Sequence, residues 1–459
     1  MIYSSLLFIY GFLPLSLFFY YITPKKFRDE SLLALSLVFC GLVGLSYLAF
    51  ISVFTLVNYG AVRAIGHYRG KSEAAAGFLA AGLLFDILTV FLFRAEMFSV
   101  LLGIMGIPES FFPIGISFMT LAAIGTLMDV YNGKTEADRN IVRFALYFTL
   151  FPRIIMGPLL RYGSFVKILG SRKPDLSDIG VGLTIFVKGL AKKVIAADTL
   201  YMLFEAVRMN GIRNMSSLSA WLGVIAYVMC LYFTLSGFAD MGTGAGYCFG
   251  LRLPQSFNYP LFSMKIRYFA ARWHVQLIQW MRRYVTKPFV SRSRNRIIRK
   301  LIFICVWGIL GFWYTFSING LIWGILIGGS IVVETRLGKQ KMLNVTGVIY
   351  TFLAVMVFTV FFFGDSLSYS LRYLFIMIGG GRNFADAFSL YLLKSYIVVL
   401  LITMYASTDL FRNMIMRSGR SALKTAVTVI TPVTVLGLLI VCTALISYGG
   451  ASEMLLIRL

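Results

Sequence analysis

Residues 301–333 read LIFICVWGILGFWYTFSINGLIWGILIGGSIVV and contain no charged side chain. A helix needs about 20 apolar residues to cross the hydrocarbon core of a bilayer, so more than thirty uncharged residues are too many for one upright helix. We therefore expect two membrane segments that meet near Ser317–Gly320. A second uncharged run, residues 31–62, predicts another break. Such breaks are tolerated where the backbone is buried in protein or lines a water-filled cavity.

The composition of the whole chain agrees with a membrane protein. Of 459 residues, 59% are hydrophobic and only 14% are charged. Soluble domains average about 45–50% apolar and about 25% charged residues, so an ordinary globular or disordered protein is excluded. The net charge of +24 would suggest nucleic acid in a soluble protein. In a membrane protein it indicates basic loops that set topology and meet anionic lipid, so we expect no nucleic-acid partner.

The apolar runs predict an all-α polytopic membrane protein with roughly ten to twelve crossings. The predicted spans are residues 3–22, 31–48, 49–62, 76–93, 111–128, 181–200, 216–238, 301–316, 318–333, 343–363, 389–407 and 426–447. The apolar N-terminus lacks a basic region and a cleavage site, so we expect it to be retained as the first span. We expect a single membrane domain, 1–459, in which 1–130 form N-terminal helices, 131–365 the core and 366–459 C-terminal helices.

The five cysteines lie in separate apolar stretches without a CxxC pair. Their spacing predicts neither a zinc site nor a disulfide framework, and we expect no bound metal. The segment 144–160 is interrupted by Pro152, Gly157 and Pro158, which predicts a re-entrant or broken helix.

Residues 265–300 hold eleven Lys or Arg and no Asp or Glu. At about 100° per residue their apolar side chains form one stripe, which predicts an amphipathic helix at the membrane surface. Its basic residues are expected to face lipid headgroups; they include Lys265, Arg267, Arg272, Arg282, Arg283 and Lys287. A topological anchor would account for most of these charges.

His274 lies on the flank of this apolar stripe, away from the basic face. Two interpretations stay open: an interfacial histidine with its ring edge in water, which the wheel geometry alone favours, and a functional group. Charged residues inside apolar segments usually mark a pathway or a buried pair. Here they are Asp86, Asp129, Arg153, Arg161 and Asp240. For Asp129, Arg161 and Asp240, structural ion pairing and a catalytic role are equal alternatives.

Five segments occur in an order that resembles a known family. They read FFPIGISFMTLAAIGTLMDVYNGK (111–134), LFPRIIMGPLLRYGSF (150–165), GLAKKVIAAD (189–198), LSGFADMGTGAGYCFGLRLPQSFNYP (235–260) and ARWHVQLIQWMRRYVTKPF (271–289). Together they resemble the membrane-bound O-acyltransferase family, in particular the bacterial branch that acts in alginate O-acetylation and teichoic-acid D-alanylation.

The resemblance implies helices around a central funnel or tunnel in the bacterial cytoplasmic membrane. A cytoplasmic thioester, acyl-CoA or an acyl-carrier protein, would donate an acyl group, most simply acetyl. The acceptor would be a hydroxyl of a cell-envelope or exported polysaccharide, reached directly or through an extracytoplasmic accessory acyltransferase or polysaccharide-synthesis proteins. No bound cofactor is implied. Expected tunnel or substrate-lining residues are Asp129, Arg161, Asp240, Asn258, Trp273, Trp313 and Asn319.

The resemblance also implies two histidines, and this chain departs from that pattern. His274 matches the first, but Tyr314 stands where the second, usually assigned as catalytic, is expected. A phenol has a reference pKa of about 10 and is a poorer general base near neutral pH than imidazole. We name His274 and Tyr314 as the candidate catalytic residues and expect both to face the protein interior, together with Trp313.

Two other functions stay open. A catalytically degenerate relative would act as a scaffold or substrate passage in an envelope-polysaccharide complex. A secondary transporter would show paired repeats, and the sequence contains none that we detect. The density of Lys and Arg predicts that loops 63–73, 166–178 and 288–300 are cytoplasmic.

Overall fold

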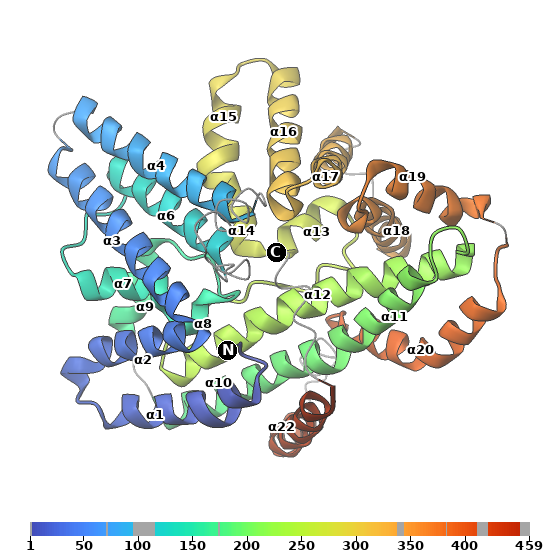
Figure 1. Ribbon diagram of the computed structural model, residues 1–459, viewed down its shortest axis with the longest axis horizontal. Coiled ribbons are helices and arrows are strands. Elements are labelled where there is room, and N and C mark those ends of the chain that lie inside the picture. The colour runs from blue at the N-terminus through green and yellow to red at the C-terminus, as the bar shows by residue number, and fades with distance from the viewer. Residues whose placement is uncertain are drawn as a thin grey trace. The chain divides into compact units, whose positions relative to one another are not determined.

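The computed structural model describes residues 2–69, 72–94, 115–172, 175–336, 344–381, 383–410 and 421–449. These ranges contain helices and no β-strand (Figure 1). Eight of the helices are long and apolar enough to cross a membrane: Leu45–His67, Glu73–Arg94, Ser217–Cys248, Arg296–Thr315, Ile318–Arg336, Val345–Phe363, Ala387–Ala406 and Thr428–Tyr448. Two shorter apolar helices are Leu7–Ile22 and Ile116–Tyr131. The chain is therefore an all-helical polytopic membrane protein, as its composition predicts.

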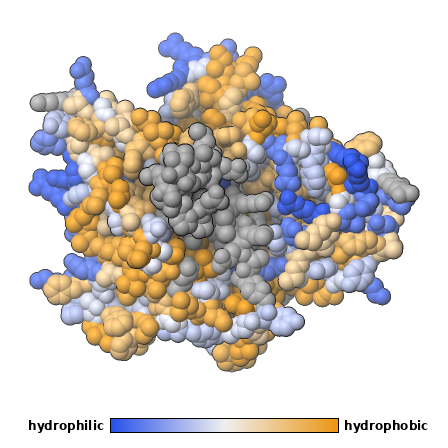
Figure 2. Space-filling view, in the orientation of Figure 1, coloured by the Kyte–Doolittle hydropathy of each residue, from blue (hydrophilic) through white to orange (hydrophobic). Residues whose placement is uncertain are grey.

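The surface supports the same conclusion. Figure 2 shows hydrophobic side chains over large parts of the visible face, with hydrophilic side chains at several places along its edge and on the right. Side chains such as Leu56 and Val433 are 60% and 72% exposed. Such an apolar exterior would be unfavourable in water, and it is the surface that a protein presents to lipid tails.

Both uncharged runs break, as predicted. The first is divided between α2 (Arg28–Val43) and α3 (Leu45–His67), with extended backbone at Gly44. The second is divided between α16 (Arg296–Thr315) and α17 (Ile318–Arg336), which meet at Phe316 and Ser317. Phe316 has a left-handed backbone with φ of 51°, and this conformation ends α16.

Glycines allow α16 and α17 to pack closely. A Cβ atom on Gly311 would clash with the carbonyl oxygen of Gly320, and one on Gly324 would clash with that of Trp307. Small residues at such a helix interface let the backbones approach, which is how helices associate in a bilayer. The break and the glycines together produce a tight helical hairpin.

The described helices fall into two compact units. The first consists of Met1–Gly189 and Phe238–Gln255. It contains η1 (Leu7–Phe12), α1 (Leu13–Ile22), η2 (Lys25–Phe27), α2, α3, α4 (Ser72–Arg94), α6 (Ile116–Tyr131), α7 (Ile141–Thr149), α8 (Phe151–Ile154), α9 (Tyr162–Ser171) and most of α10 (Leu176–Ala191). Its core includes a cluster of aromatic rings from Phe8, Phe12, Phe39 and Phe151.

The second unit consists of Leu190–Gly237 and Ser256–Leu459. Besides α16 and α17 it contains η3 (Lys192–Ala197), α11 (Asp198–Met209), the first part of α12 (Ser217–Cys248), α13 (Ile266–Arg272), α14 (Val275–Met281), η4 (Arg282–Thr286), α15 (Lys287–Arg292), α18 (Asn344–Phe363), α19 (Leu367–Phe375), η5 (Ile376–Gly380), α20 (Ala387–Ala406) and α22 (Ser421–Gly449). The single-domain organisation stays a prediction.

The segment 144–160 is broken as expected. Helix α7 ends at Thr149, the short α8 follows, and residues 155–161 are not helical before α9 begins. The first residues of the predicted span 111–128 lie outside the described part, and its helix α6 begins at Ile116. Residues 70–71 and 173–174, in two of the loops predicted to be cytoplasmic, also lie outside it. The sidedness of all three loops stays a prediction.

The prediction of one continuous amphipathic helix after Lys265 is wrong. Helix α13 ends at Arg272, and α14 begins only at Val275, because the backbone of His274 is left-handed with φ of 41°. A helical wheel assumes one uninterrupted helix, so its angular positions do not carry across this break. The apolar side chains Ile266, Phe269 and Leu277 are nevertheless buried, as the stripe predicted.

Candidate active site

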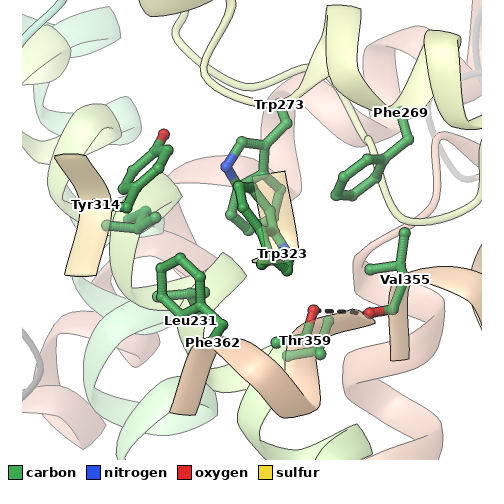
Figure 3. Close-up of a pocket in the computed structure, with 10 residues that line it drawn as sticks. Leu231, Phe269, Trp273, Tyr314, Trp323, Val355, Thr359 and Phe362 are labelled. Atoms are coloured by element: carbon green, nitrogen blue, oxygen red, sulfur yellow. Dashed lines mark hydrogen bonds between the residues drawn. The ribbon is translucent and has the colours of Figure 1, made fainter. Parts of the chain in front are cut away.

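An apolar pocket lies inside the second unit, between α12, α13, α16, α17 and α18 (Figure 3). It encloses about 390 Å³ of empty space. Its wall is formed by Val228, Leu231, Leu235, Phe269, Trp273, Tyr314, Trp323, Val355, Thr359 and Phe362. The Thr359 hydroxyl donates a 2.7 Å hydrogen bond to the carbonyl oxygen of Val355, within its own helix. The lining is therefore uncharged, with aromatic rings and hydroxyl groups among aliphatic side chains.

Tyr314 reaches this pocket from the last turn of α16. Its side chain is buried, and its ring makes edge contacts with Trp323 and Phe362, at centroid distances of 6.0 and 5.9 Å. In Figure 3 the indole nitrogen of Trp273 points toward the Tyr314 ring. The structure thus brings together Tyr314 and Trp273, two residues that are 41 positions apart in sequence. Trp313 is half-buried and lies 5.3 Å from the Tyr314 ring.

His274 directly follows Trp273 and is buried, with 1% of its surface exposed. The interpretation of an interfacial histidine with its ring edge in water is therefore wrong. The reason is the left-handed backbone at His274, which points its side chain in a direction different from the one that a continuous helix would give it. Its ring packs against Phe257 at a centroid distance of 5.3 Å.

Backbone hydrogen bonds hold this break on both sides. The N–H of Val275 donates to the carbonyl oxygen of Ser256 at 2.8 Å, and the N–H of Asn258 donates to that of Arg272 at 3.1 Å. A left-handed conformation at a residue other than glycine costs about 1–3 kcal/mol and persists where its surroundings over-determine it. Residues 256–258 provide those surroundings, so His274 is held in a fixed position.

Burial lowers the pKa of His274 from 6.5 to about 4. Removal from water disfavours the charged imidazolium, so the ring is neutral at pH 7. A neutral imidazole has one nitrogen that can accept a proton or a hydrogen bond. The group is therefore in the protonation state that a general base requires.

The predicted charged site residues belong to the first unit. Both the Nε and the Nη2 of Arg161 lie 2.8 Å from Asp129 Oδ2, so these two residues form an ion pair. Asp129 is buried, whereas the Arg161 side chain is 36% exposed. Asp240 is half-buried on α12. The ion pair between Asp129 and Arg161 is one that the structural interpretation expects, and a catalytic role for any of the three residues stays a prediction.

Two predicted asparagines do not line the pocket. The Asn319 side chain donates to the carbonyl oxygen of Gly364 at 2.7 Å and to Ser370 Oγ at 3.3 Å, so it ties the start of α17 to the segment between α18 and α19. Asn258 is exposed and contributes its backbone N–H instead. Of the basic surface residues, Lys265 is half-buried; Arg267, Arg272, Arg282, Arg283 and Lys287 are exposed, as expected for contact with headgroups.

Sequence reasoning missed Glu334, at the end of α17. Its buried carboxylate accepts the backbone N–H groups of Ile266 and Arg267, at 2.7 and 3.1 Å, and so caps the start of α13. A carboxylate is favoured at a helix N-terminus, where N–H groups lack partners within the helix. The signal was present in the sequence, because Glu334 is the first charge after the long uncharged run.

Sequence reasoning also missed a buried ion pair between Lys193 and Asp198. The pair lies across η3, a stretch of π-helix inside one of the predicted spans. Among the described residues, no group of His, Cys, Asp and Glu is arranged to hold a metal ion.

Comparisons with known proteins identify relatives of the chain. Residues 32–364 match the model of MBOAT, the membrane-bound O-acyltransferase family. The chain is 32% identical to a probable alginate O-acetylase of Pseudomonas aeruginosa over 81% of its own length and 74% of that protein. It is 27% identical to a peptidoglycan O-acetyltransferase of Helicobacter pylori, over 83% of its own length and 80% of that protein. A teichoic acid D-alanyltransferase of Bacillus subtilis is 26% identical, over 70% of this chain and 85% of that protein.

The helical fold and these relatives define a multi-pass membrane protein that is a transferase. The chain belongs to the membrane-bound O-acyltransferase family, as its five segments indicated, and it is an O-acyltransferase.

Proposed function

We propose that the protein transfers an acetyl group from a cytoplasmic thioester, acyl-CoA or an acyl-carrier protein, to a hydroxyl of a cell-envelope or exported polysaccharide. The names of its relatives support a polysaccharide acceptor, since they include alginate and peptidoglycan O-acetylation. In this proposal the protein lies in the bacterial cytoplasmic membrane, and the acetyl group reaches its acceptor directly or through an extracytoplasmic accessory acyltransferase.

One observation carries the proposal: buried His274 follows Trp273, which lines the same uncharged pocket as Tyr314. In the reaction the acceptor hydroxyl oxygen attacks the thioester carbonyl carbon, the new C–O bond forms and the C–S bond breaks. The hydroxyl proton passes to His274 and finally to the departing sulfur. His274 serves as general base, which contributes about 10²–10⁴-fold in such reactions.

Tyr314 has a different role in this proposal. Its phenol is a poor base but a good hydrogen-bond donor, and the donated bond would stabilise the negative charge that develops on the thioester oxygen. The uncharged aromatic wall suits this role because hydrogen bonds to developing charge are stronger where water is excluded.

The names of the relatives favour acetyl as the transferred group, since they include alginate and peptidoglycan O-acetylation. The preferred length of the acyl chain is a property to measure.

The test is thioester consumption by the purified full-length protein in lipid nanodiscs, with acetyl-, butyryl- and octanoyl-CoA, and acceptor oligosaccharides of alginate and peptidoglycan type. We expect acceptor-dependent release of thiol, with acetyl-CoA preferred. Val355→Trp, which fills the pocket, should abolish turnover, while Val433→Trp on an exposed surface serves as the matched control. Turnover that is unchanged in Val355→Trp would contradict the assignment of the pocket.

The same experiment distinguishes a transferase from a noncatalytic scaffold. The scaffold alternative is favoured by Tyr314, which stands where the family pattern predicts a histidine. No turnover with any donor, together with a cellular polysaccharide phenotype that survives His274→Ala, would support a noncatalytic partner. Loss of that phenotype on truncation of residues 265–300 would identify the basic segment as its contact.

A further inference from the structure

A second pocket, which no part of the proposed reaction uses, lies in the first unit. It encloses about 300 Å³ and is lined by Phe118, Met119, Tyr147, Phe148, Arg153, Ile154, Gly157, Pro158 and Leu159. Its described lining is apolar and aromatic apart from the guanidinium of Arg153.

Arg153 is held in a defined place by its neighbours. Its Nη1 donates to the carbonyl oxygen of Tyr147 at 2.6 Å, and its guanidinium carbon lies 4.0 Å above the Tyr147 ring. The Tyr147 hydroxyl is itself fixed by a 2.7 Å hydrogen bond to the carbonyl oxygen of Leu160. The turn that follows Arg153 requires glycine at position 157, because a Cβ atom there would clash with the Arg153 backbone.

The positive charge of Arg153 lacks an anionic partner within the described part of the chain. The carboxylates Asp129 and Asp138 of this unit pair with Arg161 and Arg143. A guanidinium has five N–H donors, and the described residues accept one hydrogen bond from it. The Arg153 side chain is half-buried among apolar and aromatic side chains. An uncompensated charge in such surroundings is costly, and an anion would relieve that cost.

We propose that this pocket binds an amphipathic anion, a phosphate or carboxylate group joined to an apolar chain. The anionic head pairs with Arg153, which presents planar, paired donors of the kind that bind phosphate and carboxylate in a bidentate manner. The apolar chain lies against Met119, Phe148 and Leu159. The phospholipids of the surrounding membrane carry both parts, as do free fatty acids, whereas inorganic phosphate carries only the head.

The experiment measures binding to the delipidated full-length protein by native mass spectrometry. The probes, added one at a time, are dioleoylphosphatidylglycerol, dioleoylphosphatidylcholine, laurate and inorganic phosphate. We expect one tightly bound phosphatidylglycerol, at least tenfold tighter than phosphatidylcholine. Arg153→Gln should weaken the binding of phosphatidylglycerol at least tenfold, and Arg153→Lys should weaken it by a smaller factor. Arg139→Gln, which removes an exposed positive charge from the same unit, should leave the affinity within twofold of wild type.

Met119→Trp tests the apolar half of the pocket and leaves the guanidinium in place, so it keeps the proposal testable if Arg153→Gln does not fold. It should weaken phosphatidylglycerol and laurate alike. Preferential binding of laurate would support the site and identify a fatty acid as its source. If inorganic phosphate binds with the same affinity to wild type and to Met119→Trp, the apolar half of the proposed site is overturned. Equal binding of phosphatidylglycerol and phosphatidylcholine, or no change in Arg153→Gln, would overturn the proposal.

Discussion

The pocket at Tyr314 and the pocket at Arg153 have similar apolar and aromatic walls but differ in charge. The first contains no ionised side chain, and the buried His274 beside its Trp273 is neutral at pH 7. The second contains a permanent cation. An uncharged site favours a neutral thioester and its hydroxyl acceptor, whereas a cationic site favours an anion. Within one membrane protein, single side chains therefore assign similar pockets to different ligands.

The strongest test of this comparison removes His274, the neutral base that we propose and that follows the pocket-lining Trp273. His274→Ala should lower acyl transfer at least 10²-fold, the loss typical of a missing general base, with normal expression and folding. The measurement is kcat/KM for thiol release by the protein in nanodiscs. His67→Ala is the matched control, because His67 is exposed. Equal losses in the two variants would contradict a specific role for His274.

Tyr314→Phe should have a smaller effect on the same assay. It removes one hydrogen bond, worth about 1 kcal/mol or somewhat more when buried, so we expect roughly a tenfold loss of kcat. Tyr314→His should retain or exceed wild-type activity, since it restores the residue that the family pattern predicts. Tyr391→Phe, on an exposed part of α20, controls for the loss of a hydroxyl. A loss beyond 10³-fold in Tyr314→Phe would assign Tyr314 a proton-transfer role instead.

The neutrality of His274 also predicts a dependence of stability on pH. Its pKa is about 4 in the folded protein and 6.5 in the unfolded chain, so the unfolded chain binds more protons between these values. Its contribution to stability is therefore complete above pH 6.5 and is lost as the pH falls toward 4. The Tm of His274→Gln should fall less than that of wild type between pH 7 and 4.5, whereas His67→Gln should keep the wild-type slope. Parallel slopes in all three proteins would show that His274 is accessible to water.

The smallest effect is expected at Glu334, which supports the pocket without lining it. Glu334→Gln keeps one acceptor for the N-terminus of α13 and should cost about 1 kcal/mol, whereas Glu334→Ala leaves both N–H groups without this partner and should cost about 2–3 kcal/mol. The measurement is Tm, with Glu30→Gln on an exposed position as the control. If Glu334→Ala unfolds like wild type but binds donor less well, the cap positions the site without adding stability.

The parts of the fold that follow from local chemistry were predictable. Uncharged length alone predicted that residues 31–62 and 301–333 each break, because membrane thickness limits a single helix. The first break lies at Gly44 and not between the predicted spans 31–48 and 49–62. The prolines and glycines of residues 144–160 likewise predicted the interrupted helix around Arg153. The order of the five family-like segments then identified the family and indicated His274 and Tyr314 as candidate catalytic residues.

The burial of His274 was not predictable in the same way. A helical wheel presumes continuity, and the break at His274 depends on hydrogen bonds to residues 256–258, which tertiary contact alone provides. The partners of Glu334 lie 67 and 68 positions away, so no local pattern identifies them. Arg153 was recognised as a charge in an apolar segment, but the pocket in front of it is a property of three-dimensional packing.

The glycines between α16 and α17 have a consequence for how donor preference can change in evolution. Helix α16 carries Tyr314 and α17 carries Trp323, so the separation of the two helices sets the spacing of these two pocket-lining rings. An alanine at Gly311 or Gly324 would clash with the opposite backbone and force the helices apart. Selection for a bulkier acyl group could therefore act through one methyl group at this interface, without altering any residue that touches the substrate.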